Sequence, residues 1–129
     1  MPAYDGHLFS PPAPFAKVSL RNPENGTVVS DVGMLLDTGA DVTLLPRTFI
    51  ERLGISAEQD EGYELRGFNG SVSVAQVVQA DLLFLRRAFK GSFLLIDQEW
   101  GLIGRDILNH VSLVFDGQRL VWEEKPRSG

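Results

Sequence analysis

The 129-residue sequence contains no cysteine, few basic residues and no long apolar run. Without cysteine there is no disulfide framework and no thiolate nucleophile, and a zinc site would have to be built without sulfur. The formal net charge of −5 argues against a nucleic-acid surface, because phosphates demand a basic patch. No segment approaches the ~20 apolar residues that cross a membrane, and the N-terminus does not resemble a signal peptide. We therefore expect a cytoplasmic protein that binds neither nucleic acid nor membrane.

The size and composition predict one small domain. A hydrophobic content of 43% is enough for a core, but a chain this short has few apolar residues beyond those that the core needs. A deep two-lobed cleft would be hard to build from a single copy. The two histidines, His7 and His110, lie far apart and have no helical partner, so no metal site or cofactor is expected.

Hydrophobic patterning predicts a mostly β fold with one or two short helices. Residues 1–14 are rich in proline and small residues, so we expect an extended arm that does not pack as an element; residues 15–124 form the domain, and 125–129 a loose tail. The Asn25-Gly26 turn joins the first two strands. The predicted strands span 15–22, 27–37, 40–46, two within 63–85, 88–97, 101–104 and a hairpin within 112–124 over Asp116-Gly117; the predicted helices lie within 47–55, with Gly54 as the stop, and from about Arg105.

The stretch Asp37-Thr38-Gly39 lies between two apolar runs, where an unpaired carboxylate is costly. Gly39 lets the backbone turn sharply and lets another group approach closely, and Thr38 offers a hydroxyl for a hydrogen bond. The tripeptide alone is common in ordinary turns. A second stretch far along the chain, apolar-apolar-Gly-Arg-Asp at 102–106, makes the combination much rarer, and its Leu102-Ile103-Gly104 faintly repeats the pattern before Gly39.

This combination resembles the retroviral-type aspartic proteases, the retropepsins. "LLDTGADVTLLP" is similar to their active-site loop and "GLIGRDIL" to their late strand-to-helix segment, in the same order and spacing. The resemblance spans roughly residues 15–122 and is closer in style to cellular and bacterial members than to viral ones. It implies a single-domain retropepsin-like closed β-barrel that is active as a two-fold homodimer.

The resemblance also implies a mechanism without cofactor or metal. Asp37 of one subunit would meet Asp37 of the other, and two carboxylates so close share one proton. The ionised partner would activate a water as general base, and the protonated one would donate to the scissile carbonyl of an extended peptide.

Further roles follow from the resemblance, position by position. Thr38 would brace the two loops across the dimer axis, and the carbonyl of Gly39 would face the substrate backbone. Arg105 would form a structural ion pair with Asp41, although a surface arginine without a fixed partner is the plainer alternative. The remaining positions are the cleft-lining residues Ala40, Asp41 and Val42, and the residues that pack behind the loop, Leu102, Ile103 and Gly104.

The segment Gly67-Phe68-Asn69-Gly70 falls where retropepsins carry the flap that closes over a bound peptide; it could equally be a plain hairpin tip. Phe68 would reach toward the partner chain. Apolar candidate wall residues, Val42, Ile96 and Leu102, predict a preference for hydrophobic residues about the cut bond.

The C-terminal hairpin, including Leu120 and Trp122, is expected to supply most of the dimer interface, because the proline-rich N-terminus is a poor strand. Two other interpretations of the sequence remain. One is a catalytically silent retropepsin-like module that binds a peptide or only dimerises. The other is a generic β-barrel with an accidental turn.

Overall fold

A computed structural model describes the backbone of residues 1–56, 58–66 and 72–126, and the side chains of 1–56 and 76–126. The described chain forms ten strands and two short helices. Their bounds are β1 Tyr4–Asp5, β2 Ala13–Arg21, β3 Val28–Leu36, β4 Leu44–Pro46, α1 Arg47–Arg52, β5 Glu58–Arg66, β6 Val72–Phe84, β7 Arg87–Ile96, β8 Gly101–Ile103, α2 Arg105–Leu108, β9 Leu113–Asp116 and β10 Val121–Glu124.

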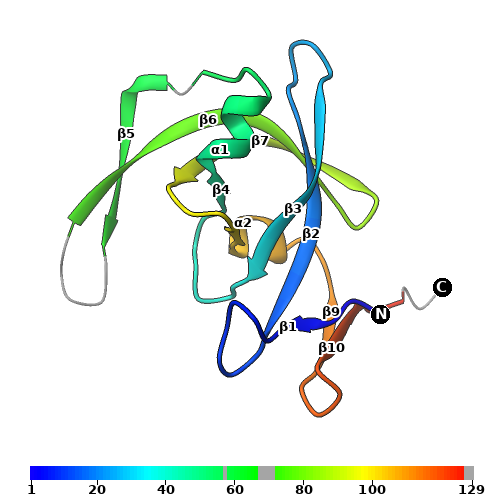
Figure 1. The fold of residues 1–129 in the computed structure, drawn as a ribbon. Helices are drawn as coiled ribbons and strands as arrows, with labels where there is room; N and C mark the ends of the chain where they lie inside the picture. Colours follow the sequence, from blue (N-terminus) through cyan, green and yellow to red (C-terminus); the bar gives the residue numbers. More distant parts are fainter. Residues whose placement is uncertain (57, 67–71, 127–129) are drawn as a thin grey trace.

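Six strands close into a barrel in the order β2-β3-β8-β4-β7-β6, because β6 pairs back onto β2 (Figure 1). Two of the pairings, β3–β8 and β4–β7, are parallel, and the others around the barrel are antiparallel. Strand β1 pairs with β2, and β5 pairs with β6. The predicted mostly β closed barrel with two short helices is therefore confirmed.

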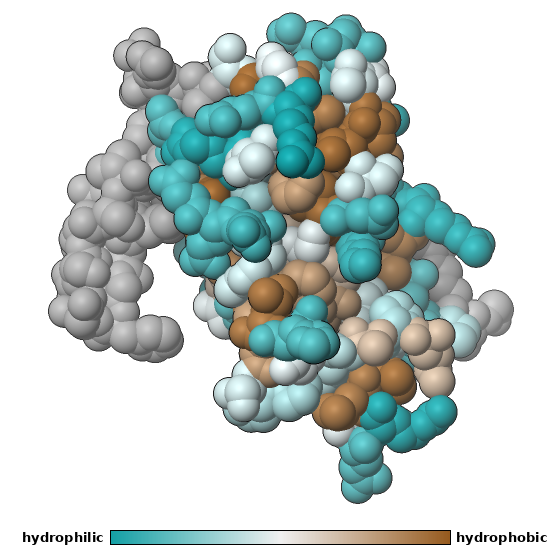
Figure 2. Space-filling model, viewed as in Figure 1, coloured by the Kyte–Doolittle hydropathy of each residue, from teal (hydrophilic) through white to brown (hydrophobic). Residues whose placement is uncertain are grey.

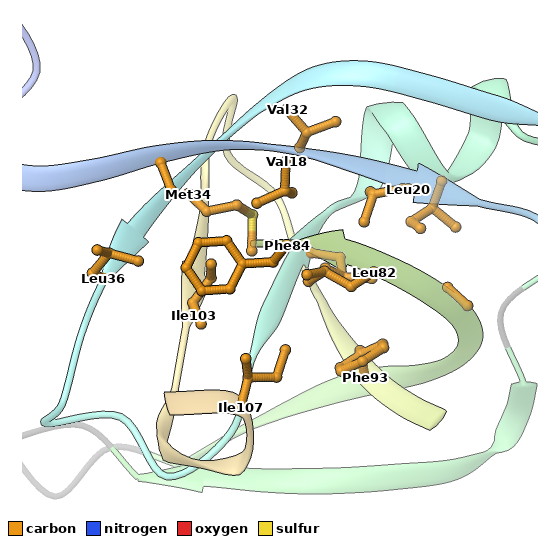
Figure 3. Close-up of a cluster of buried hydrophobic side chains, with 14 of the residues drawn as sticks. Val18, Leu20, Val32, Met34, Leu36, Leu82, Phe84, Phe93, Ile103 and Ile107 are labelled. Atoms are coloured by element: carbon orange, nitrogen blue, oxygen red, sulfur yellow. The ribbon is translucent and has the colours of Figure 1, made fainter. Parts of the chain in front are cut away.

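The barrel interior is filled by the alternate apolar residues that the sequence pattern predicted. From Ala16 on in β2 and from Val32 on in β3, every second residue is buried, as expected for strands with one face on a core. Side chains from β2, β3, β6, β7, β8 and α2 point toward one another in this core (Figure 3). The labelled members are Val18, Leu20, Val32, Met34, Leu36, Leu82, Phe84, Phe93, Ile103 and Ile107.

The predicted turns and helix stops are also observed. Gly26 has φ +76° in the connection between β2 and β3, and Gly54 has φ +70° directly after α1, a left-handed conformation that glycine adopts without steric cost. Helix α1 buries Ile50 against the core, and Leu53 follows as its C-terminal cap. Helix α2 begins at Arg105, as the sequence indicated.

The N-terminal arm, which we expected to be extended and unpacked, bends at residues 6–8 and 10–11 and forms the short strand β1, which packs against the domain. Tyr4 pairs with Pro14 in β2, and the Tyr4 amide donates to the carbonyl of Leu120 over 2.8 Å. The amide of Trp122 in turn donates to the carbonyl of Pro2 over 2.9 Å. The arm therefore lies between β2 and the C-terminal hairpin.

The C-terminal hairpin forms as predicted, with Val121 opposite Asp116. Its connection is residues 117–120, slightly beyond the Asp116-Gly117 turn that the sequence suggested. Trp122 is 3% exposed, packs against Phe84 and donates from Nε1 to the carbonyl of Phe15 over 3.0 Å. The expectation that Trp122 lies in a dimer interface is therefore wrong, because the core of its own chain encloses it.

Candidate active site

Asp37 directly follows β3, at the edge of the barrel. The parallel pair β3–β8 places Leu35 beside Leu102 and Leu36 beside Ile103, so the two similar sequence stretches lie side by side. The amide of Asp37 continues this ladder by donating to the carbonyl of Ile103 over 3.0 Å. Residues Leu102 and Ile103 therefore lie beside the segment that leads into the Asp37 turn.

A tight turn then fixes the Asp37 carboxylate. The amide of Gly39 donates to Oδ1 of Asp37 over 2.9 Å, and the amide of Ala40 donates to its main-chain carbonyl over 3.2 Å. A Cβ on residue 39 would stand 3.1 Å from that carboxylate oxygen, which is a tight contact. Glycine at this position avoids the contact. Asp37 is half-buried, whereas Thr38 and Gly39 are exposed. In a single chain the turn therefore presents its tip to the surface.

A buried threonine, which the sequence reasoning missed, supports the loop from behind. Thr43 is fully buried, and its hydroxyl donates to Oδ1 of Asp106 over 2.6 Å and accepts from the amide of Gly104 over 3.1 Å. The amide of Thr43 donates to the other oxygen of Asp106 over 3.0 Å. The sequence signal was a polar residue inside the apolar run "VTLLP", which indicates a satisfied buried hydroxyl.

The start of α2 holds the loop at two further points. A Cβ on Gly104 would lie 2.5 Å from the carbonyl of Val42, so this close approach requires glycine. The amide of Arg105 donates to the carbonyl of Ala40 over 2.9 Å, and Nη1 of Arg105 donates to the carbonyl of Thr38 over 2.7 Å.

The expected ion pair between Asp41 and Arg105 does not form among the described side chains of this single chain. The guanidinium donates to the Thr38 carbonyl instead. Arg105 still supports the active-site loop, but through the backbone and not through a carboxylate.

One row of apolar residues crosses the sheet on the face opposite the core. Each member is the direct register partner of the next, across six strands. The row is Phe15, Leu35, Leu102, Leu44, Leu94 and Val77. Because successive strand residues point to opposite faces, Asp37 falls on the same face as Leu35. A row of apolar side chains therefore runs past the carboxylate; Phe15, Leu35 and Leu102 are half-buried, and the other three members are buried.

The predicted wall residues join this row. Val42, Ile96 and Leu102 pack around Leu44 and its neighbours in an apolar cluster that is separate from the main core. The three candidate wall residues thus lie in one apolar cluster, and their role in binding a substrate stays a prediction. The candidate flap residues Gly67, Phe68, Asn69 and Gly70 lie outside the described residues; the strands on either side of them, β5 and β6, pair antiparallel.

Among the described residues, no group of three or more His, Asp or Glu side chains could hold a metal ion. No helix in the described part of the chain is long and apolar enough to span a bilayer.

Comparison with known proteins gives the family. No curated protein matches the chain. Among solved structures, the EIAV protease in complex with the inhibitor HBY-793 is 26% identical, with a TM-score of 0.59, over 76% of this chain and 86% of that one. The retroviral protease-like domain of Ddi1 from Leishmania major shares the fold at 17% identity, with a TM-score of 0.50, over 89% and 91% of the two chains. A retropepsin-like aspartic protease from Rickettsia conorii also matches, at 16% identity and a TM-score of 0.49, over 79% and 86%.

The profile of a protein family described as "gag-polyprotein putative aspartyl protease" matches residues 25–110. That range includes the Asp37 turn, the Thr43–Asp106 contact and the whole apolar row except Phe15. The chain belongs to this family of retropepsin-like aspartic proteases.

Proposed function

We propose that the protein is an aspartic endopeptidase, active as a two-fold homodimer. The observation that carries the proposal is the position of Asp37, which is held in a rigid turn at the surface of one chain and beside an apolar row. In a two-fold assembly the same patch meets itself, so an exposed turn of this kind would meet its own copy. Two carboxylates brought together in this way share one proton and act as a unit.

The chemistry divides between the two carboxylates. The ionised one takes a proton from a water held between them, and the resulting hydroxide oxygen forms a bond to the carbonyl carbon of the peptide. The protonated one gives its proton to the carbonyl oxygen. Proton transfer to the amide nitrogen then accompanies breakage of the C–N bond, which releases an amine and a carboxylic acid. No metal or cofactor takes part in this scheme.

The neighbouring residues have supporting roles in this proposal. The exposed hydroxyl of Thr38 is free to bond across the dimer axis, and the Gly39 carbonyl is offered to the substrate backbone. Ala40, Asp41 and Val42 line the cleft on the same loop. The segment 67–70 closes over the peptide as a flap.

The substrate is an extended peptide with hydrophobic side chains next to the cut bond. The apolar row and its neighbours Val42 and Ile96 present the surface against which such side chains would pack. A peptide that adds its backbone to the loop alternates its side chains, so every second one faces this surface.

The dimer interface is proposed to include the β9–β10 hairpin. Strand β9 pairs with β10 on one edge and with no other described strand on the opposite edge. Val114, Phe115 and Leu120 on this hairpin are each 42% exposed. In Figure 2 apolar patches are separated by polar atoms, and one patch lies at the lower end, where Figure 1 places this hairpin. An open edge with apolar side chains favours pairing with a second copy.

A second candidate function is a catalytically silent retropepsin-like module that binds a peptide or only dimerises. It shares the fold, the apolar row and the interface, and it differs only in the chemistry at Asp37. The same experiment therefore separates the two.

Asp37→Asn tests the proposal, with Asp31→Asn on the preceding strand β3 as the matched control. Asp31 is exposed and has φ +60°, a conformation that asparagine tolerates well. The Asp37 variant should keep its thermal unfolding and its sedimentation but lose cleavage of a peptide library, while the Asp31 variant keeps cleavage. A silent module would give a wild-type protein that cuts no peptide in the library.

A further inference from the structure

A cavity of about 440 Å³ lies away from the Asp37 turn, where the start of β7 meets the connection from α2 to β9 and the end of β10. Sites for small ligands typically have volumes of about 300–1,000 Å³, so the cavity is large enough for one. The residues that line it are Arg87, Asn109, His110, Val111, Ser112, Glu124, Lys125 and Pro126.

The guanidinium of Arg87 is held in place at this cavity. Its Nη1 donates to the carbonyl of His110 over 2.7 Å, and its central carbon lies 5.4 Å from the centroid of the Phe89 ring. Leu85, in the turn that leads into β7, packs against the main core and so fixes the turn before Arg87. Since a guanidinium has five N–H donors, one bond to a carbonyl leaves others for a ligand.

The opposite side of the cavity is tied together by its backbone. The amide of Lys125 donates to the carbonyl of Ser112 over 2.8 Å, which joins the end of β10 to the segment before β9. The amide of His110 donates to the carbonyl of Ile107 over 2.9 Å. The imidazole of His110, the hydroxyl of Ser112 and the side-chain amide of Asn109 are all groups that can donate to an anion.

The charge around the cavity is opposite in sign to that of the whole chain. Arg87 and Lys125 line it with a single carboxylate, that of Glu124, whereas the chain has a formal net charge of −5. Neither cation takes part in an ion pair among the described side chains. Cations that gather at a cavity raise the local concentration of anions, so an anionic ligand is favoured here.

A second cavity of about 410 Å³ adjoins the first and shares Arg87 and His110 with it. It adds a third cation, Lys90, and one carboxylate, that of Asp106. Both oxygens of Asp106 already accept from Thr43, one from its hydroxyl and the other from its amide. The two residues that the cavities share therefore stand at the centre of a predominantly cationic surface.

From this arrangement we propose that the first cavity binds a phosphate group, with Arg87 as its main contact and Lys125 and His110 beside it. A guanidinium matches two phosphate oxygens at once, and such charge-assisted hydrogen bonds are stronger than neutral ones. Two cations and several neutral donors suit phosphate better than a carboxylate, because phosphate carries more charge and more acceptor oxygens. The site is separate from Asp37 and does not depend on the proposed endopeptidase function.

Isothermal titration of the full chain at constant ionic strength tests the proposal with three probes. Phenyl phosphate represents a phosphate monoester of a small molecule, inorganic phosphate represents the free ion, and benzoate has the same ring with a carboxylate. Both phosphates should bind saturably and more tightly than benzoate. Tighter binding of phenyl phosphate than of inorganic phosphate would assign the site to a small organic phosphate, and equal binding would assign it to the free ion; both results support a phosphate site.

Arg87→Gln should raise the Kd for phenyl phosphate at least about tenfold, the effect of losing one hydrogen bond between charged groups. Arg86→Gln is the matched control, because Arg86 is the adjacent exposed residue, carries the same charge and lines neither cavity. It should change the Kd less than about threefold, as expected for a screened charge that does not touch the ligand.

A second set of variants leaves the bond between Arg87 and the His110 carbonyl intact. Lys125→Gln should weaken binding, and Glu124→Gln should strengthen it, because the one carboxylate of the cavity repels the phosphate. Glu123→Gln, at the adjacent exposed position outside the cavity, should leave the Kd unchanged. In nitrogen-15 NMR spectra, phenyl phosphate should shift the amide signals of His110 and Lys125 and leave that of Gly39 unmoved.

The proposal is overturned if neither phosphate binds saturably, or if benzoate binds as tightly as phenyl phosphate. Equal weakening by Arg86→Gln and Arg87→Gln would also overturn it, since it would show attraction to charge without a site. Asp37→Asn protein should bind phenyl phosphate as the wild type does. Loss of peptide cleavage would therefore leave the phosphate site standing, and absence of phosphate binding would leave the endopeptidase proposal standing.

Discussion

Thr43 joins the two sequence motifs of the candidate site into one structure. Its hydroxyl sits between Asp106 and the amide of Gly104, so the active-site loop and the start of α2 share one buried contact. The sequence shows that both motifs exist, but not this link, because the partners are far apart along the chain. For the same reason the partner of Arg105 could not be predicted: a backbone carbonyl, that of Thr38, competes with the Asp41 carboxylate, and only the folded loop decides between them.

Thr43→Val keeps the volume of the side chain and removes the hydroxyl. The Gly104 amide and one Asp106 oxygen then lose a buried partner, which should lower the free energy of unfolding by about 1–3 kcal/mol. Urea denaturation measures this loss. Thr48→Val on exposed α1 is the control and should change stability little, since threonine and valine have similar helix propensities. Equal stability of the two variants would contradict the role of Thr43.

The turn between β6 and β7 holds two non-glycine residues in the left-handed region, Leu85 at φ +54° and Arg86 at φ +61°. Each such residue costs roughly 1–2 kcal/mol relative to the right-handed conformation. Arg86 is exposed, so Arg86→Gly should relieve this cost and raise the unfolding free energy by about 1 kcal/mol. Lys90→Gly, at an exposed extended position of β7, should instead destabilise. A fall in the melting temperature of Arg86→Gly would refute this prediction.

At the scale of elements, local patterns predicted most of the fold. Alternating apolar residues predicted strands at β2 and β3, where alternate residues are buried. Glycine predicted the turn at Gly26 and the end of α1. The predictions that were wrong concern elements whose packing partners lie far away in the sequence. The N-terminal arm packs because residues 2–4 meet 120–122, and no local signal reports that pairing.

The C-terminal hairpin shows the same limit. Its sequence predicted two strands but not which face is free, and the structure encloses Trp122 while exposing Phe115 and Leu120. Because Trp122 is part of the core, removal of residues 118–129 would damage the fold as well as any interface. Point changes at the exposed residues of the hairpin are therefore the sharper test.

Phe115→Glu places a charge on the proposed interface, at a residue that is 42% exposed. The variant should sediment as a monomer at concentrations where the wild-type protein is a dimer, because a buried unpaired carboxylate in the interface is costly. Its thermal unfolding as a monomer should remain cooperative. Val28→Glu, a similar change at a residue 49% exposed on the far hairpin, is the control and should leave sedimentation unaltered. A dimeric Phe115→Glu variant would place the interface elsewhere.

At the scale of the whole molecule, the barrel gives each chain half of the proposed site. One chain supplies one carboxylate and one apolar row, both on the same face of the sheet. The sequence predicted this half-site through two motifs, but the continuous row across six strands follows only from the register, which single-strand patterns do not reveal. The proposed chemistry needs the second half from another copy.

The most direct test of this account measures the specific activity on one peptide against enzyme concentration, with sedimentation recorded on the same samples. If the site is shared, specific activity should rise with concentration in step with the dimer fraction and should fall when excess Asp37→Asn protein is added to form mixed dimers. Specific activity that stays constant while the protein sediments as a monomer would contradict the account.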